Sequence, residues 1–275
     1  MIRFLLSVTT LLLASIFNVN GQMSERAFFY SASYISDSTE RESRGEDLMV
    51  LWTGKDYSVF ESYYRYQLDS FKTAASNQSS NPADLNMQAV LQQAISMRKP
   101  SFNFIVHKSL IDKEITVYNT LFFDNFRYEQ PLVIAGWKIG TQKEQVLGFS
   151  CQKATITYAG REFIAWFSEE IPISDGPYVF NGLPGLILKI EDVHGDYRFE
   201  LIGIQNKQVD MKGRTLSKSI DLSKEQFFRT KSAMYKDVRK ALLGKPTSAV
   251  SDDAILDVQQ RYDKMNNPLE LVYFK

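Results

Sequence analysis

Hydrophobic residues near the start of the chain gather in two blocks whose length and composition are typical of β-strands. The first covers residues 27–35 and the second covers residues 48–52. A polar segment over residues 36–45 separates them, and Gly54 follows the second block. Because aliphatic and aromatic runs bounded by turn-forming residues indicate strands, this pattern predicts a hairpin with a long connection.

The next apolar residues recur with a helical period. They lie at i, i+4, i+8 and i+11 and form one helix face: Phe60, Tyr64, Leu68 and Phe71. A second helix is predicted to begin with Asn81 as its cap and Pro82 in its first turn, and to end at Pro100. Its apolar face consists of Met87, Val90, Leu91, Ala94 and Ile95.

From residue 101 to about residue 204 the pattern changes to short apolar or alternating segments joined by glycine-containing turns, which favours antiparallel strands. Helical signals then return. Ser223 and Gln226 have the spacing of a capping box, and Ser251 is placed to cap a last helix that runs to about residue 265. That helix is expected to turn Ile255, Val258, Tyr262 and Met265 inward.

These patterns together predict an α+β fold. We expect a curved antiparallel sheet, resembling half of a barrel, with helices over residues 58–98 and 223–265 packed on one face or at one end. The alternative is a β-sandwich of two sheets with peripheral helices.

The first 21 residues have the composition of an export signal. Arg3 supplies a positive charge, residues 4–17 are mostly apolar, and Val19-Asn20-Gly21 resembles a cleavage site. The apolar run is too short for a transmembrane helix, which needs about 20 residues. We therefore expect residues 22–275 to form one exported domain, periplasmic or secreted, with no membrane span.

The charge balance narrows the range of partners. The chain has 32 Lys and Arg residues against 32 Asp and Glu residues, so it has no basic excess for nucleic-acid binding. Its one cysteine, Cys151, cannot form an internal disulfide.

One hairpin can be paired from the sequence alone. If Ala159 and Gly160 form a two-residue turn, Tyr158 pairs with Arg161, and the pairing continues through Ala154 with Ala165. Trp166 then lies on a mixed face opposite Lys153, where its ring could cover a groove or stack on the ammonium group.

A Gly-Leu-Pro-Gly-Leu-Ile string stands at residues 182–187. Upstream of it lie Trp137-Lys138-Ile139, Gly148-Phe149-Ser150-Cys151 and Gly176-Pro177-Tyr178, in a fixed order and close spacing. Over about residues 137–202 the chain resembles the exported Bacteroidetes family named after the string, the GLPGLI family. The resemblance implies export and a cell-envelope location, and the family has no assigned activity.

The string has a backbone interpretation. In Leu183-Pro184-Gly185-Leu186, proline and glycine occupy the positions that a type II turn requires, and Gly176-Pro177 predicts a second bend. Gly182 belongs to the same structural signature. The functional alternative is a loop that presents Tyr178 and Asn181 to a ligand, with Trp166 as a further candidate binding residue.

Catalytic chemistry has weaker support. A nucleophilic Cys151 needs a base, but the only histidines are His107 and His194 and neither lies in a known motif. The acidic residues form two clusters at predicted strand ends: Glu169, Glu170 and Asp175, then Glu191 and Asp192. No spacing indicates a metal site or a cofactor.

Two functions remain open. The favoured one is a non-enzymatic binding or accessory protein of the cell envelope, whose partner is another envelope protein or an apolar or peptide-like ligand. The alternative is a hydrolase that uses a carboxylate or Cys151.

Overall fold

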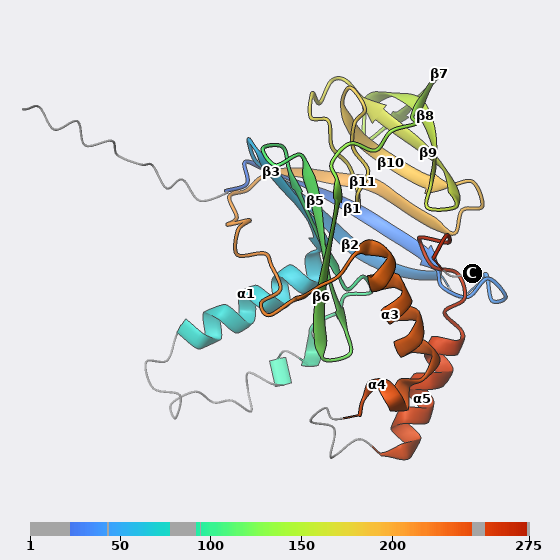
Figure 1. Cartoon of the computed structure of the whole chain (residues 1–275). Helices are drawn as coiled ribbons and strands as arrows, with labels where there is room; N and C mark the ends of the chain where they lie inside the picture. The colour runs from blue at the N-terminus through green and yellow to red at the C-terminus, as the bar shows by residue number, and fades with distance from the viewer. Residues whose placement is uncertain (1–22, 43, 78–91, 94, 244–250, 274–275) are drawn as a thin grey trace, which may run out of the picture.

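The computed structural model describes residues 23–42, 44–77, 92–93, 95–243 and 251–273. The predicted signal, the predicted helix cap at Asn81 and most of the helix after it lie outside these residues. Figure 1 shows a sheet that dominates the fold, with α1 on one side and the helices α3, α4 and α5 below it.

Over the described residues the sheet contains twelve strands in the order β12-β6-β5-β4-β3-β2-β1-β11-β10-β9-β8-β7. Their bounds, in chain order, are β1 (Arg26–Ile35), β2 (Arg44–Thr53), β3 (Tyr57–Ser62), β4 (Phe104–Ser109), β5 (Glu114–Leu121), β6 (Asp124–Pro131), β7 (Lys138–Val146), β8 (Phe149–Tyr158), β9 (Arg161–Ser168), β10 (Leu186–Asp192), β11 (Tyr197–Asn206) and β12 (Ile220–Asp221).

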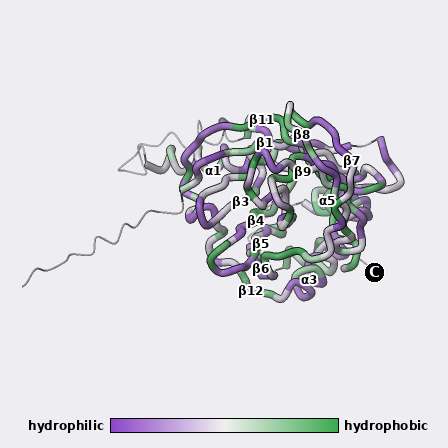
Figure 2. Tube along the Cα trace, turned by 90° about the horizontal axis from the view of Figure 1, so that it is seen from above, coloured by the Kyte–Doolittle hydropathy of each residue, from purple (hydrophilic) through white to green (hydrophobic). Residues whose placement is uncertain are grey.

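The predicted fold class is wrong. The sheet is mixed rather than antiparallel, because β12 runs parallel to β6. It is one continuous sheet and therefore not a sandwich, and it does not close, since β12 and β7 remain as its two edges. Figure 2 shows the strands following an arc, with α3 and α5 on its open side.

In the described part of the chain, the helices with assigned bounds are short and are divided between different places. They are α1 (Tyr63–Asn77), α3 (Lys224–Lys236), α4 (Val238–Ala241) and α5 (Asp252–Asp263). α1 contacts β2 and β3, whereas α3 contacts β6. A helix that covered a sheet face would bury its apolar stripe, but no residue of α5 is buried. The prediction of helices packed on one face is therefore incorrect.

The expected helix around residue 60 is partly a strand. Residues 57–62 form β3, in which Val59 and Phe60 are both fully buried on opposite faces of the sheet. A short strand that is buried on both faces shows no clear alternation of apolar and polar residues. Phe60 therefore matched, by its spacing alone, the apolar face of the helix that follows. Of the second predicted helix face, Ile95 is described and is 71% exposed.

Two local predictions are confirmed. The hairpin of β8 and β9 pairs Tyr158 with Arg161 and Ala154 with Ala165. Its turn residues Ala159 and Gly160 have φ of 48° and 85°, as a type I′ turn requires. At the start of α3, Ser223 and Gln226 form the expected capping box.

The inner side of the sheet is filled by a loop together with α3, whose Phe227 and Phe228 belong to the same buried core. Residues 169–185, here called the signature loop, join β9 to β10 and bury five apolar side chains against the inner core: Ile171, Tyr178, Val179, Phe180 and Leu183. The outer side carries a smaller core around Phe29 and Trp52, covered by α1 and by residues 207–216. The loop thus lies where it can shape any cavity inside the sheet.

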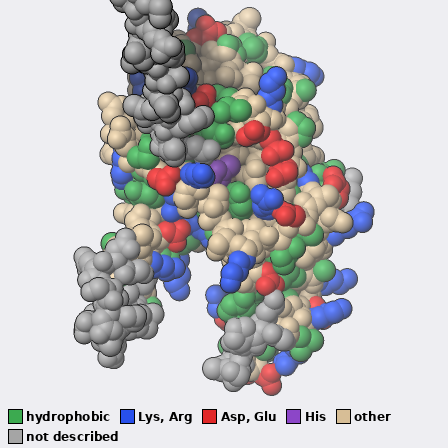
Figure 3. Space-filling view, turned by 60° about the vertical axis from the view of Figure 1, so that its left-hand side comes forward, with side chains coloured by type: hydrophobic (Ala, Val, Ile, Leu, Met, Phe, Trp, Pro, Cys, Tyr) green, Lys and Arg blue, Asp and Glu red, His purple; other side chains and the backbone are tan. Residues whose placement is uncertain are grey.

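Charged side chains are mixed over the surface. On the face shown in Figure 3, Lys and Arg side chains lie among Asp and Glu side chains, in keeping with the zero formal net charge of the sequence. Among the described residues, no helix is long and apolar enough to cross a membrane.

Candidate functional site

The signature loop is a tight corner, but not the predicted type II turn. Gly185 has φ of 158°, a backbone conformation that residues with a side chain rarely adopt, and its N–H donates to the Leu183 carbonyl at 2.8 Å. The Leu186 N–H, which would close a type II turn, donates instead to Ile171 O at 3.0 Å. The bond across Pro184 is therefore that of a γ-turn.

Gly185 is needed both for its positive φ and for space. A Cβ atom on Gly185 would lie 2.1 Å from the carbonyl oxygen of Ser168, at the end of β9. Gly182 differs, because its φ is 90° and an added Cβ would meet nothing closer than 3.8 Å. At Gly176 the added atom would approach the side chain of Ile187 to 2.7 Å.

A buried ion pair holds the signature loop to the sheet. The Lys108 ammonium donates to Asp175 Oδ1 at 2.5 Å, to Gly176 O at 2.6 Å and to Phe180 O at 3.2 Å. Ser58 also donates to Asp175. Burial lowers the pKa of Lys108, and the neighbouring Asp175 opposes that shift. One predicted carboxylate of the 169–175 cluster is therefore structural.

The three predicted binding residues lie apart. Asn181 is buried, donates to Val179 O at 2.9 Å and lines a cavity of about 220 Å³ beside Lys108 and Asp175. Trp166 is half-buried on β9 with the Lys189 ammonium 5.8 Å from its ring. Lys153, which pairs with Trp166 as predicted, donates to Gln142 instead of stacking.

Tyr178 is the predicted binding residue that reaches the interior of the curved sheet. Its φ of 52° is unusual for a residue with a side chain. Backbone outliers of this kind cost about 1–3 kcal/mol and cluster at functional sites. The Tyr178 hydroxyl donates to Glu270 Oε1 at 2.6 Å, and burial together with the Glu270 charge raises the pKa of Tyr178.

Glu270 is the centre of a buried polar cluster. Its side chain is 1% exposed and lies 2.9 Å from the Lys224 ammonium. Tyr158 donates to the same carboxylate at 3.4 Å, and Lys224 donates to the Tyr158 hydroxyl at 2.6 Å. The Tyr128 hydroxyl lies 3.4 Å from that of Tyr178. The carboxylate charge is thus balanced by Lys224 and solvated by phenols.

The segment that carries Glu270 is fixed by a second buried cluster. Arg161 donates to Pro268 O at 2.8 Å, forms an ion pair with Asp192 at 3.0 Å and also donates to Asn267. Asn267 in turn donates to Ile35 O at 2.8 Å. Residues from β1, β9 and β10 therefore determine where the C-terminal segment, residues 267–273, crosses the inner core.

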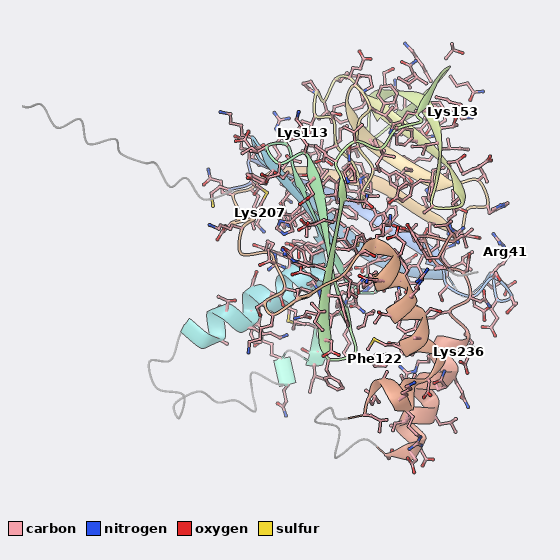
Figure 4. All side chains as sticks on the ribbon, in the orientation of Figure 1. Arg41, Lys113, Phe122, Lys153, Lys207 and Lys236 are labelled. Atoms are coloured by element: carbon pink, nitrogen blue, oxygen red, sulfur yellow. The ribbon has the colours of Figure 1, made fainter. Side chains whose placement is uncertain are left out.

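A cavity of about 260 Å³ opens between the inner face of the sheet and α3 and α5. Glu270 and Tyr178 line it at one side. Its walls are mainly aromatic: Tyr34, Phe102, Phe104, Tyr128, Tyr197, Phe227, Phe228, Tyr235 and Tyr262. Phe122, labelled in Figure 4, reaches from the turn after β5 to the rings of Tyr235 and Tyr262.

Sequence reasoning missed Glu270, Lys224 and the cavity itself. Nothing in the pattern Pro268-Leu269-Glu270-Leu271 distinguishes a buried acid from a surface acid. Its burial depends on contacts with Tyr178 and Tyr158, which lie about a hundred positions away in the chain. The capping box at Ser223 is the sequence signal nearest to Lys224, because it determines where α3 begins.

The catalytic candidates do not assemble into a site. Cys151 is fully buried, and burial raises the pKa of its thiol to about 11. His107 Nε2–H donates to Arg214 O at 2.7 Å, and His194 is exposed. Asp192 pairs with Arg161, and Glu170 accepts from Ser150 N at 2.8 Å. Within the described part of the chain, no group of three or more His, Cys, Asp or Glu residues could hold a metal ion.

A family model described as a protein of unknown function (Porph_ging) matches residues 158–189, from the β8–β9 turn through the signature loop into β10. The match covers a short segment of the chain, and the family that it describes has no known function. A comparison with curated proteins finds no match.

Two solved structures of PNGF-II, in space groups P21 and C2, resemble the chain at 11% and 12% identity. The alignments cover 75% and 78% of this chain, and 32% of the PNGF-II chain in each case. The chain therefore spans about a third of the length of these structures. Both TM-scores are 0.48, so the likeness carries no argument about function.

Proposed function

We propose that this chain is an exported binding protein of the GLPGLI family, and that its ligand is a small apolar molecule or an apolar side chain of a peptide. The aromatic cavity inside the sheet is the observation that carries the proposal. Ligand sites are concave and mostly apolar, with a few convergent polar groups, and this cavity combines aromatic walls with Tyr178 and Glu270.

The size of the cavity limits the ligand. An apolar cavity of about 150 Å³ holds a benzene molecule. At about 260 Å³, this cavity has room for one ring with a short substituent. Tyr178 supports the proposal independently, because its left-handed backbone directs a phenol to Glu270 at the cavity wall. The same residue belongs to the signature loop, so the loop and the cavity form one structural unit.

The hydrolase alternative lacks a comparable arrangement. Asp175 and Asp192 pair with cations, and Glu170 accepts a hydrogen bond from Ser150 N. Burial holds the Cys151 thiol in its protonated form. No described constellation favours it over binding.

A cavity-filling variant tests the binding proposal. Val117 is 2% exposed and lines the cavity, so Val117→Phe would occupy the space that a ligand needs. Val133, 70% exposed, gives the matched control Val133→Phe. We expect toluene to bind the wild type and Val133→Phe but not Val117→Phe, measured by ligand-observed NMR. Equal binding by both variants, with Val117→Phe folded by circular dichroism, would show that the cavity is not the site.

The export proposal is tested separately. The intact mass of the protein recovered from a bacterial envelope fraction should correspond to a chain that begins at Gln22. A product that retains residues 4–17 would contradict it.

A further inference from the structure

The cavity has one positive charge without a partner. Two charged side chains line it, Glu270 and Lys231. Glu270 already has its counter-ion, since Lys224 lies 2.9 Å from its carboxylate. Lys231, on the inward side of α3, makes no hydrogen bond and no ion pair with any residue that the structure describes. Its ammonium lies 5.5 Å from the ring centre of Tyr235.

Glu270 is the acidic side chain whose charge acts on Lys231, and it is already paired with Lys224. The remaining titratable side chains of the cavity wall are phenols: Tyr34, Tyr128, Tyr178, Tyr197, Tyr235 and Tyr262. Burial raises the pKa of Tyr128, Tyr178, Tyr197, Tyr235 and Tyr262, so these hydroxyls stay neutral near neutral pH. Glu270, Lys224 and Lys231 together therefore leave the cavity with a net charge of about +1.

We propose that the ligand is an anion: an apolar body of about one ring that ends in a carboxylate, with the carboxylate paired to Lys231 and the ring among Phe102, Phe104 and Phe228. The inference rests on the binding function proposed above and specifies the ligand class. A carboxylate suits the site because a charge-assisted hydrogen bond to a half-buried ammonium restores the charge balance. Tyr235 then stacks against the paired ammonium.

The same chemistry has two possible sources, a free acid and the C-terminal residue of a peptide. Both present an apolar side chain next to a carboxylate. The cavity volume of about 260 Å³ admits the terminal side chain and carboxylate of a peptide, with the rest of the peptide outside.

Calorimetric titration of the full mature chain near neutral pH separates these possibilities. The probes are 3-phenylpropionate, its neutral amide, and acetyl-Gly-Gly-Phe with a free C-terminus. We expect the acid to bind at least about tenfold more tightly than the amide, a difference of about 1.4 kcal/mol. Binding of the peptide as tight as that of the acid, or tighter, identifies a peptide C-terminus as the source. Binding of the acid alone identifies a free acid.

Lys231→Met tests the role of the ammonium, because methionine keeps the length of the side chain and removes its charge. It should lower the affinity for the acid about tenfold and leave that for the amide unchanged. Lys236→Met is the matched control, since Lys236 is exposed on the same helix (Figure 4). It should change neither affinity. Thermal melting of both variants establishes that they are folded.

Two results would overturn the inference. Equal affinities of the wild type for the acid and the amide would show that the carboxylate is not recognised, and the binding function would stand. If none of the probes binds, and toluene does not bind either, the binding function fails along with it.

Discussion

Replacing Gly185 by alanine should destabilise the protein strongly, for a reason that can be worked out from the structure. The new Cβ would lie 2.1 Å from Ser168 O, 2.6 Å from Ser168 C and 2.9 Å from Glu169 N. All three are backbone atoms, so no side-chain rotation relieves the contact. Ser168 pairs with Leu186 between β9 and β10, and the oxygen would have to move from 2.1 Å to beyond 3.0 Å.

The expected cost follows from overpacking. Inserting atoms into a packed core costs about 1–3 kcal/mol where side chains can move, and more where they cannot. We therefore expect Gly185→Ala to lose about 3 kcal/mol or more. For a domain of this size, each kcal/mol corresponds to about 2–4 °C in melting temperature, so the loss should be about 6–12 °C.

Two other glycines calibrate the measurement. A Cβ on Gly203, in β11, would meet nothing within 4 Å, so Gly203→Ala should be close to neutral. Gly182→Ala should cost about 1 kcal/mol, because its φ of 90° is unfavourable for alanine although the space is open. Urea unfolding of the three variants gives the ranking. If Gly185→Ala unfolds like Gly203→Ala, the signature does not form a crowded corner and its glycine needs another explanation.

Three further predictions concern buried ionisable groups. Lys108→Met should cost about 3–5 kcal/mol, since it leaves Asp175 buried without its counter-ion; a loss below about 1 kcal/mol in urea unfolding would contradict this. The Cys151 thiol should react with a disulfide reagent only after unfolding, because it is fully buried and its pKa is raised to about 11; stoichiometric labelling of the native protein within minutes would refute the assignment. Burial lowers the pKa of Lys231 from its ordinary 10.5 to about 8. Between these two pH values Lys231 is therefore protonated in the unfolded chain and deprotonated in the folded chain. The free energy of unfolding should therefore rise between about pH 8 and pH 10.5 because of Lys231, and Lys231→Met should remove this rise. Identical pH profiles of the two proteins would show that the ammonium is not desolvated.

Local structure could be predicted where a few neighbouring residues determine it. Ala159-Gly160 fixes the register of the β8–β9 hairpin, and Ser223 with Gln226 fixes the start of α3. Both depend on backbone geometry within about four residues. The signature was also predicted as a structural corner with a positive φ at Gly185, and its φ is positive. The predicted turn type was wrong, because Leu186 N donates to Ile171 O instead of closing the turn, and the crowding of Gly185 against the distant backbone of Ser168 has no signal in the sequence.

Long-range arrangement was not predictable in the same way. Phe60 is compatible with a strand or a helix, and only pairing with β2 and β4 settles which one forms. The amphipathic helices suggested cover for one sheet face, yet the signature loop covers that face together with α3, and α1 lies on the other face. Of the predicted binding residues, Tyr178 lines the aromatic cavity. Glu270 and Lys231 line it too, but no local pattern in the sequence indicates this, because the cavity forms only where the C-terminal segment crosses the core.

The most direct test of the binding proposal is a crystal structure of residues 22–275 soaked with 4-bromotoluene, a neutral ring that carries an anomalous scatterer. The ring is small enough for a cavity of about 260 Å³ and needs no pairing with Lys231, so the result is independent of the carboxylate inference. We expect one dominant bromine peak among Phe102, Phe104 and Phe228. An empty cavity, with bromine peaks only at other places on the protein, would contradict it.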